Sequence, residues 1–330
     1  MIRSTHLPLI VTLVTFVLAF ALCGSQYPSI LSTRVVANLL TDNAFLGIVA
    51  VGMTFVILSG GIDLSVGSVI AFTGVLLAVI LRDTSMHPLT AFALALVITT
   101  AFGAAMGATI HYLEMPPFIV TLAGMFLARG AAYVLSTDSV PIDHAFYDTL
   151  QGIYWKAAGG GRFRLIGGLM VVTFIVGAVV AHRTRFGQNV YALGGGAQTA
   201  KLMGVPLAQT TIGIYAISGG LAGLAGIVFS LYTSAGYSLA TVGVELDAIA
   251  AVVIGGTLLS GGYGFVAGTF FGILIMGLIQ TYIVFDGTLS SWWTKIVIGM
   301  LLFAFILLQK GLTWATTVRK RRATGSAALS

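Results

Sequence analysis

An apolar run at residues 44–74, AFLGIVAVGMTFVILSGGIDLSVGSVIAFTG, is long enough to cross a bilayer, yet polar residues and glycines interrupt its middle. The interruption includes Ser59, Gly60, Gly61 and Asp63. Hydrocarbon can neither hydrogen-bond a freed backbone nor solvate a carboxylate, so these residues must lie at an interface, inside packed protein or along an aqueous path. The run therefore predicts a membrane protein that moves a solute.

The rest of the chain has the same character. Hydrophobic residues make up 58% of its 330 residues and charged residues 8%, whereas a soluble globular domain carries about 25% charge. Apolar runs predict an all-α, polytopic fold of about ten transmembrane helices in one domain, residues 1–330. The expected helices are 7–23, 43–58, 64–81, 89–110, 117–135, 165–181, 212–232, 247–260, 265–285 and 292–309. We expect the first to be retained, because it has no convincing small-residue cleavage site.

The charged residues predict the orientation of these helices. With ten spans and a cytoplasmic N-terminus, the inside segments hold more than half of the 16 Lys and Arg residues, and the outside segments hold most of the 10 acidic residues. This distribution follows the positive-inside bias. Both termini, including a basic tail at 310–330, are therefore expected in the cytoplasm. The net charge of +6 is explained by this topology and by attraction to anionic lipid, without a nucleic acid partner.

Two segments between helices are long enough for a separate role. Residues 136–164, on the outside, are expected either to receive a soluble partner or to cap the bundle as a structured loop. Residues 182–211, on the inside, contain Gly194, Gly195 and Gly196, which are expected to break the chain.

A short amphipathic helix is predicted at residues 197–205, with Pro206 stopping it. Such a helix between two turns either docks a cytosolic motor or lies flat on the membrane surface. The residues alone leave both interpretations open.

Asp63 also has two interpretations. Intramembrane acids are often proton relays, but the adjacent Gly60 and Gly61 favour a turn at the cytoplasmic end of a helix, where the carboxylate caps the next helix. Arg129, in the fifth span, is expected to extend toward water rather than to contact a ligand. The stretch LSGGIDLSVGS at 58–68 resembles LSGGYGFVAGT at 259–269, which is either a trace of duplication or a chance match in a Gly-rich chain.

Motifs for enzyme chemistry are absent from the sequence. It has no GxxxxGK[ST] phosphate loop, no HExxH and no Cys or His pair at metal spacing, and its one cysteine, Cys23, cannot form a disulfide within the chain. We therefore expect a protein that is not an enzyme and binds no metal. If ATP drives transport, another chain must bind it.

Four segments resemble the ribose-type sugar permeases of bacterial ABC importers, in the order in which that family carries them. They are VGMTFVILSGGIDLSVGS, MPPFIVTLAGM, RTRFGQNVYALGGGAQTAKLMGV and VELDAIAAVVIGGTLLSGGYGFVAGT. Together with FDGTLSSWWTKI at 285–296, they are most similar to permeases of galactofuranose importers. The resemblance implies a type II importer fold in the bacterial inner membrane and a monosaccharide cargo.

The resemblance also implies partners and roles. A second permease subunit, as a heterodimer or homodimer, a periplasmic sugar-binding protein, and ATPase subunits that use ATP and Mg would complete the importer, while this chain binds no cofactor. In this family the loop between the sixth and seventh helices carries the coupling helix. The implied ATPase-coupling residues are Gly194, Gly195, Gly196, Ala200, Lys201, Leu202 and Gly204.

The candidate pathway or gating residues are Ser59, Gly60, Gly61, Asp63, Glu245 and Asp247. Glu245 and Asp247 are expected at the outer mouth, where they support that mouth or contact the binding protein. The alternative function is an ion- or proton-coupled secondary transporter that uses Asp63 at a broken helix.

Overall fold

The structure, a computed structural model, describes residues 7–290, 292–307 and 311. Among them, seven helices are long and apolar enough to cross a membrane. They are α1 (Leu7–Gln26), α4 (Val66–Asp83), α5 (Pro88–Tyr112), α6 (Pro117–Leu135), α8 (Leu165–Arg183), α11 (Leu207–Thr233) and α13 (Val266–Asp286). An eighth span is formed if α2 (Thr33–Asp42) and α3 (Ala44–Leu58), bent by 56°, are taken together. With the shorter helices α12 (Val244–Ile254) and Trp292–Leu307, the all-α fold of about ten apolar helices is confirmed.

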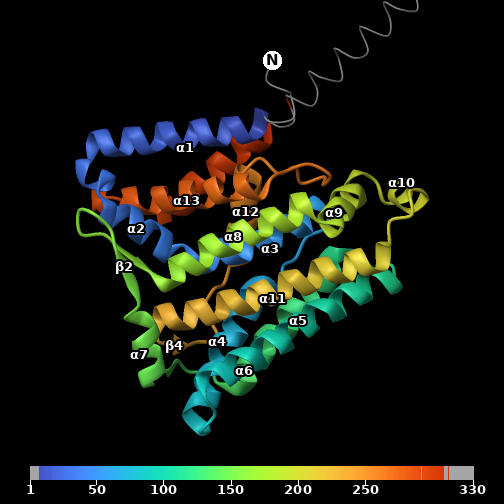
Figure 1. The fold of residues 1–330 in the computed structure, drawn as a ribbon, viewed down its shortest axis with the longest axis horizontal. Coiled ribbons are helices and arrows are strands. Elements are labelled where there is room, and N and C mark those ends of the chain that lie inside the picture. Colours follow the sequence, from blue (N-terminus) through green and yellow to red (C-terminus); the bar gives the residue numbers. More distant parts are fainter. Residues whose placement is uncertain (1–6, 291, 308–310, 312–330) are drawn as a thin grey trace, which may run out of the picture.

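The long helices run roughly parallel, so the bundle has two ends (Figure 1). The end on the right carries α9 (Arg185–Gly195) and α10 (Ala197–Leu202) and is called here the α10 end. The end on the left carries α7 (Ala145–Gln151) and a hairpin of β2 (Tyr154–Lys156) and β3 (Arg162–Arg164), and is called the α7 end. The remaining short elements are η2 (Pro28–Leu31), β1 (Val140–Pro141) and β4 (Ala235–Gly236), of which β1 and β4 pair antiparallel.

The segment between α3 and α4, residues 59–65, turns back into the bundle and is called here the re-entrant segment. Its start lies at the α10 end, where the Leu58 carbonyl accepts a hydrogen bond from Gly262. Its middle lies deeper, because Asp63 accepts a hydrogen bond from Ser218, near the centre of the 27-residue α11. Asp63 therefore lies in the non-helical segment that follows α3, and it accepts a hydrogen bond from the Ser65 amide just before α4, as the capping interpretation expected, but it is buried inside the bundle rather than at its end. The turn is at Gly60, which has a φ of +83°.

A second irregular segment, residues 237–243, connects β4 to α12. It packs against the first turn of α4, where the Thr241 hydroxyl donates to the Gly67 carbonyl at 2.7 Å. The helix that follows is shorter than the predicted 247–260: α12 starts at Val244 and ends at Ile254, followed by Gly256 with a φ of +90°. The apolar residues that suggested a longer helix continue beyond this glycine break.

Glycines allow the central helices to touch backbone to backbone. A Cβ on Gly103 of α5 would overlap the carbonyl oxygen of Tyr215, and a Cβ on Gly219 of α11 would overlap the carbonyl oxygen of Thr99. Helices in lipid gain no hydrophobic drive from association, so close backbone contact through small residues supplies dispersion energy instead. The abundance of glycine, 42 residues, therefore has a direct structural use at this contact.

Residues 136–164 form a structured cap at the α7 end. His144 Nδ1 accepts a hydrogen bond from the Phe146 amide at the start of α7, and the buried Tyr147 hydroxyl lies 3.1 Å from Ser230 Oγ of α11. This arrangement agrees with the capping interpretation and does not test the binding of a soluble partner. Apart from Gly311, the expected basic tail at 310–330 lies outside the described residues.

Candidate functional site

The predicted coupling loop forms two short helices at the α10 end (Figure 1). Thr184 caps α9 by accepting a hydrogen bond from Gly187 at 3.1 Å. The chain breaks only at Gly196, whose φ is +153°; Gly194 and Gly195, which were expected to break it too, form the last turn of α9. The second helix ends at Leu202, and a turn at Gly204, with a φ of +80°, precedes Pro206, so the proline does not stop it.

The side chains of this second helix divide into a buried and an exposed set. Ala200 is 0% exposed, whereas Leu202 is 89% exposed and the following Met203 is 66% exposed. Lys201 is exposed as well. The exposed surface at the end of α10 therefore consists of Lys201, Leu202 and the C-cap residue Met203. Ala200, which the sequence placed among the coupling residues, is buried instead.

Glycines from three segments meet at the end of α9, just before α10, in a cluster that we call the glycine joint: Leu58–Gly61, Gly194–Gly195 and Ser260–Gly262. A Cβ on Gly194 would overlap both the carbonyl oxygen of Leu58 and the amide nitrogen of Gly262, which are themselves hydrogen-bonded at 2.8 Å. The two stretches that resemble each other, at 58–68 and 259–269, thus touch at their LSGG residues. Close packing of this kind transmits displacement because it leaves no space to absorb it.

Tyr191 of α9 reinforces the joint. Its hydroxyl donates to the carbonyl of Gly264 at 2.8 Å, and its ring makes an edge contact with that of His182, which stacks on Phe265. Burial raises the pKa of Tyr191 to about 12, with a smaller contribution from Tyr263, so the phenol stays protonated and keeps donating at physiological pH.

A buried polar network surrounds Asp63, which is 0% exposed. Its carboxylate accepts hydrogen bonds from the Ser65 amide and hydroxyl, at 2.9 and 2.7 Å, and from the Ser218 hydroxyl at 2.7 Å. The neighbouring Ile62 carbonyl is within 3.4 Å of the hydroxyls of Thr121 and Tyr215. Asp63 thus binds Ser65, the N-cap residue of α4, and also ties the re-entrant segment to α11. Polar residues in the middle of apolar spans, such as Ser218, were the available signal for this network.

The other candidate pathway residues lie apart from one another. The Ser59 hydroxyl donates back to Val56 O at 2.7 Å near the α10 end. Asp247, in the first turn of α12, accepts two hydrogen bonds of 2.7 Å from Lys295, while the Glu245 carboxylate faces Gly67. The structure therefore does not gather these residues into one cluster.

The sequence predicted that Arg129 extends toward water, but its guanidinium binds backbone carbonyls instead. It is half-buried, and one guanidinium nitrogen, Nη1, donates to the carbonyls of Ser238 at 2.5 Å and Ala240 at 2.7 Å. It therefore binds the irregular segment that precedes α12.

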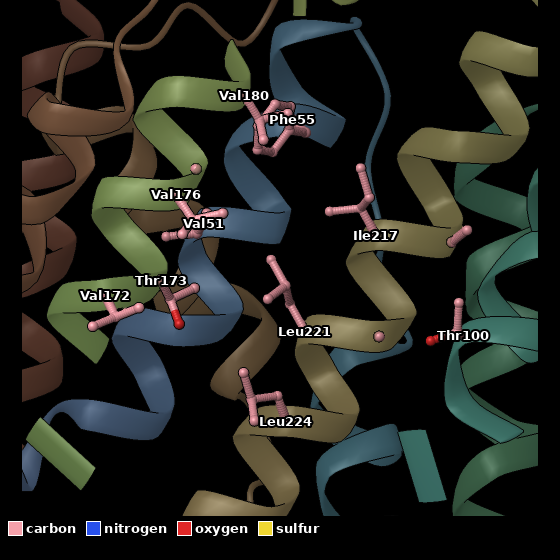
Figure 2. Close-up of a pocket in the computed structure, with 13 residues that line it drawn as sticks. Val51, Phe55, Thr100, Val172, Thr173, Val176, Val180, Ile217, Leu221 and Leu224 are labelled. Atoms are coloured by element: carbon pink, nitrogen blue, oxygen red, sulfur yellow. The ribbon is translucent and has the colours of Figure 1, made fainter. Parts of the chain in front are cut away.

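A groove of about 490 Å³ opens between α3, α8 and α11 (Figure 2). Val51, Val176 and Leu221 point toward one another across it, and hydroxyls come only from Thr100 and Thr173. A sugar needs several hydrogen-bonding partners, so this apolar groove suits an acyl chain or a helix better than a sugar.

In the described part of the chain, no group of three His, Cys, Asp or Glu residues could hold a metal ion.

Comparison with known proteins places this architecture in a family. Residues 35–306 match the family described as "Branched-chain amino acid transport system / permease component". The chain is 64% identical over 308 residues to the inner membrane ABC transporter permease protein YjfF of Escherichia coli K12, which covers 93% of each chain. It is 36% identical to the fructose import permease protein FruG of Bifidobacterium longum, over 92% of this chain and 91% of that one. It is also 35% identical to the ribose import permease protein RbsC of E. coli K12, over 90% and 92%. No solved structure matches.

A multi-pass bundle with a short projecting helix pair at one end and broken helices inside it is therefore the permease subunit of an ABC importer, in the inner membrane. The chain belongs to this permease family, in its ribose-type sugar permease group, which confirms the resemblance of the motifs. Such subunits are not enzymes and bind no cofactor; a separate ATPase subunit uses the nucleotide, and a substrate-binding protein completes the importer.

Proposed function

We propose that this subunit conducts a monosaccharide, specifically galactofuranose, into the cell as one of two permeases of an ABC importer. This cargo is supported by the resemblance of the four family segments, taken together with FDGTLSSWWTKI at 285–296, to permeases of galactofuranose importers. The relatives named above import ribose or fructose, or carry no cargo in their names, and so support a sugar in general.

The single observation that carries the mechanism is the glycine joint at the end of α9, directly before α10. We propose that the ATPase grips the exposed face of α10, at Lys201, Leu202 and Met203. ATP binding closes the ATPase pair and displaces α10. Because the glycine joint is closely packed, it transmits this displacement to α3 and to the turn between α12 and α13. The helices then open toward the outside, and ATP hydrolysis resets them.

The orientation follows from the same proposal. The α10 end faces the cytoplasm, together with both termini, and the α7 end faces the periplasm. The cap at 136–164 and the first turn of α12, which holds Glu245 and Asp247, then lie toward the sugar-binding protein. Ser59, Gly60, Gly61 and Asp63 belong to the re-entrant segment, which we propose moves with α3 as part of the gate.

An ion-coupled transporter is less well supported. A proton or ion relay needs a carboxylate that can exchange with water, whereas all three hydrogen bonds described for Asp63 come from Ser65 and Ser218 and the side chain has no exposed surface. Asp63 is better suited to hold the re-entrant segment than to carry a proton.

The cargo is tested by purifying the complex that contains this chain, identifying its soluble binding protein, and measuring the affinity of that protein for galactofuranose, galactopyranose, ribose and fructose. The proposal predicts that galactofuranose binds at least about tenfold more tightly than the others, a difference of about 1.4 kcal/mol. Preference for ribose or fructose would contradict the cargo and leave the importer mechanism unaffected.

A further inference from the structure

Arg129 stands out because it is a cation within a membrane-spanning helix that binds backbone. Charged side chains at such positions are costly unless they face protein or water and find partners. Its partners are the carbonyls of Ser238 and Ala240, in a stretch with no regular secondary structure between β4 and α12. This stretch lies beside spans α4 and α6, so its freed carbonyls need donors that lipid cannot supply. The guanidinium is the donor for two of them.

The same segment carries other signs of a constrained position. Thr241 has a φ of +59°, unusual for a β-branched residue, and its hydroxyl binds Gly67 of α4. The Ser238 side chain is 0% exposed, whereas Val242 is 68% exposed. One side of the segment is therefore held inside the bundle by Arg129 and Thr241, while its other side faces outward.

Glu245 offers the guanidinium a second partner. Among the described residues, its Oε2 is buried without a hydrogen-bond partner, and its negative charge acts on Arg129. A buried carboxylate oxygen without a donor is unfavourable, and arginine binds carboxylates with strong, often two-pronged hydrogen bonds. The guanidinium therefore has two alternative sets of acceptors close to each other, the two carbonyls and the carboxylate.

We propose that Arg129 is a positioning residue for transport that holds residues 237–243 against α6 and exchanges these carbonyls for Glu245 when the segment moves. With the guanidinium on the carbonyls, as in this structure, the segment is held in. With the guanidinium on Glu245, the segment is released and its inner side reaches water. The exchange is driven by ATP and so rests on the proposed function, whereas the holding role does not.

Ser238 provides the reporter. Its hydroxyl has no hydrogen-bond partner among the described residues, so Ser238→Cys replaces it at little cost and places a thiol on the held side of the segment. Cys23 is the only native cysteine and is removed by Cys23→Ala. The full transporter complex is reconstituted in liposomes, and the rate of labelling by a water-soluble maleimide is measured without nucleotide and during ATP turnover.

Without nucleotide, Arg129→Met should raise the labelling rate at least about tenfold and Arg129→Lys, which keeps a donor cation, by clearly less. The matched control Lys295→Met removes a cation that binds Asp247 rather than the segment, and should leave the rate unchanged. Equal rates for Arg129→Met and Lys295→Met would overturn the positioning role. If the Arg129→Met complex does not assemble, Arg129→Lys tests the positioning role instead. A labelling rate of Arg129→Lys equal to that of the parent would then contradict the positioning role.

During ATP turnover, the parent should label faster than at rest, and Glu245→Gln should remove that acceleration while leaving the resting rate low. Equal acceleration in Glu245→Gln would overturn the exchange, because the carboxylate would then be unnecessary. If ATP does not change the labelling rate of the parent, both the exchange and the ATP-driven function are contradicted. The labelling rates of the Arg129 variants without nucleotide would still decide whether Arg129 holds the segment.

Discussion

Replacing Gly194 by alanine tests the glycine joint most sharply. The added methyl group would overlap the Leu58 carbonyl and the Gly262 amide, so the segments must separate by roughly 1 Å. Overpacking of this kind costs about 1–3 kcal/mol. Loss of the 2.8 Å hydrogen bond between those two groups costs about 1–3 kcal/mol more.

Alanine also favours the helix over glycine by about 1 kcal/mol, which offsets part of this cost. The expected net effect of Gly194→Ala is a loss of roughly 3 kcal/mol in the free energy of unfolding. The matched control is Gly195→Ala, one residue further in the same turn, because a Cβ there would meet nothing within 4 Å. That variant should be as stable as the parent, or more stable.

The assay compares thermal unfolding of the purified complex with ATP hydrolysis and sugar uptake in liposomes. Gly194→Ala should unfold several degrees earlier and should hydrolyse ATP with little uptake, because the displacement of α10 no longer reaches α3. In Gly195→Ala, sugar uptake should remain coupled to ATP hydrolysis. If the two variants unfold and transport alike, the joint is neither close-packed nor the route of coupling, and the reasoning fails.

Three further predictions concern other contacts. Leu202→Glu should abolish co-purification with the ATPase while the permease unfolds at its usual temperature; retained co-purification would show that the exposed face of α10 is not the docking surface. Ser218→Ala leaves one oxygen of Asp63 without its donor and should lower the free energy of unfolding by about 1–3 kcal/mol, and an unchanged unfolding temperature would contradict the network. Gly103→Ala should separate α5 from α11 and destabilise the protein by about 1–3 kcal/mol; Gly130→Ala, where a Cβ meets nothing, should be harmless, and equal stability of both would argue against backbone contact.

Apolar length alone predicted most of the helices. For example, α6 has the bounds 117–135 that the sequence indicated, because Pro117 starts it and a long apolar run defines it. The helix α2 was missed, since Arg34, Asn38 and Asp42 interrupt its apolar pattern. It forms nonetheless as the bent continuation of α3.

Tertiary contacts explain what the sequence could not predict. Gly60 and Gly61 suggested a turn, and the turn exists, but only the partner Ser218, 155 residues away, shows how deep Asp63 lies. Similarly, the spacing of α10 could not show that Ala200 is covered while Leu202 is exposed, because the covering surface comes from other segments. Arg129 was assigned to water because no single stretch of sequence reveals the carbonyls that it binds.

The central claim is that a separate ATPase drives transport through this subunit. It is tested most directly by measuring galactofuranose uptake into liposomes that contain the permease pair and the binding protein, with and without the ATPase subunit. The account predicts ATP-dependent uptake only with the ATPase present, unchanged when proton and sodium gradients are collapsed. Gradient-driven uptake by the permeases without the ATPase would contradict it.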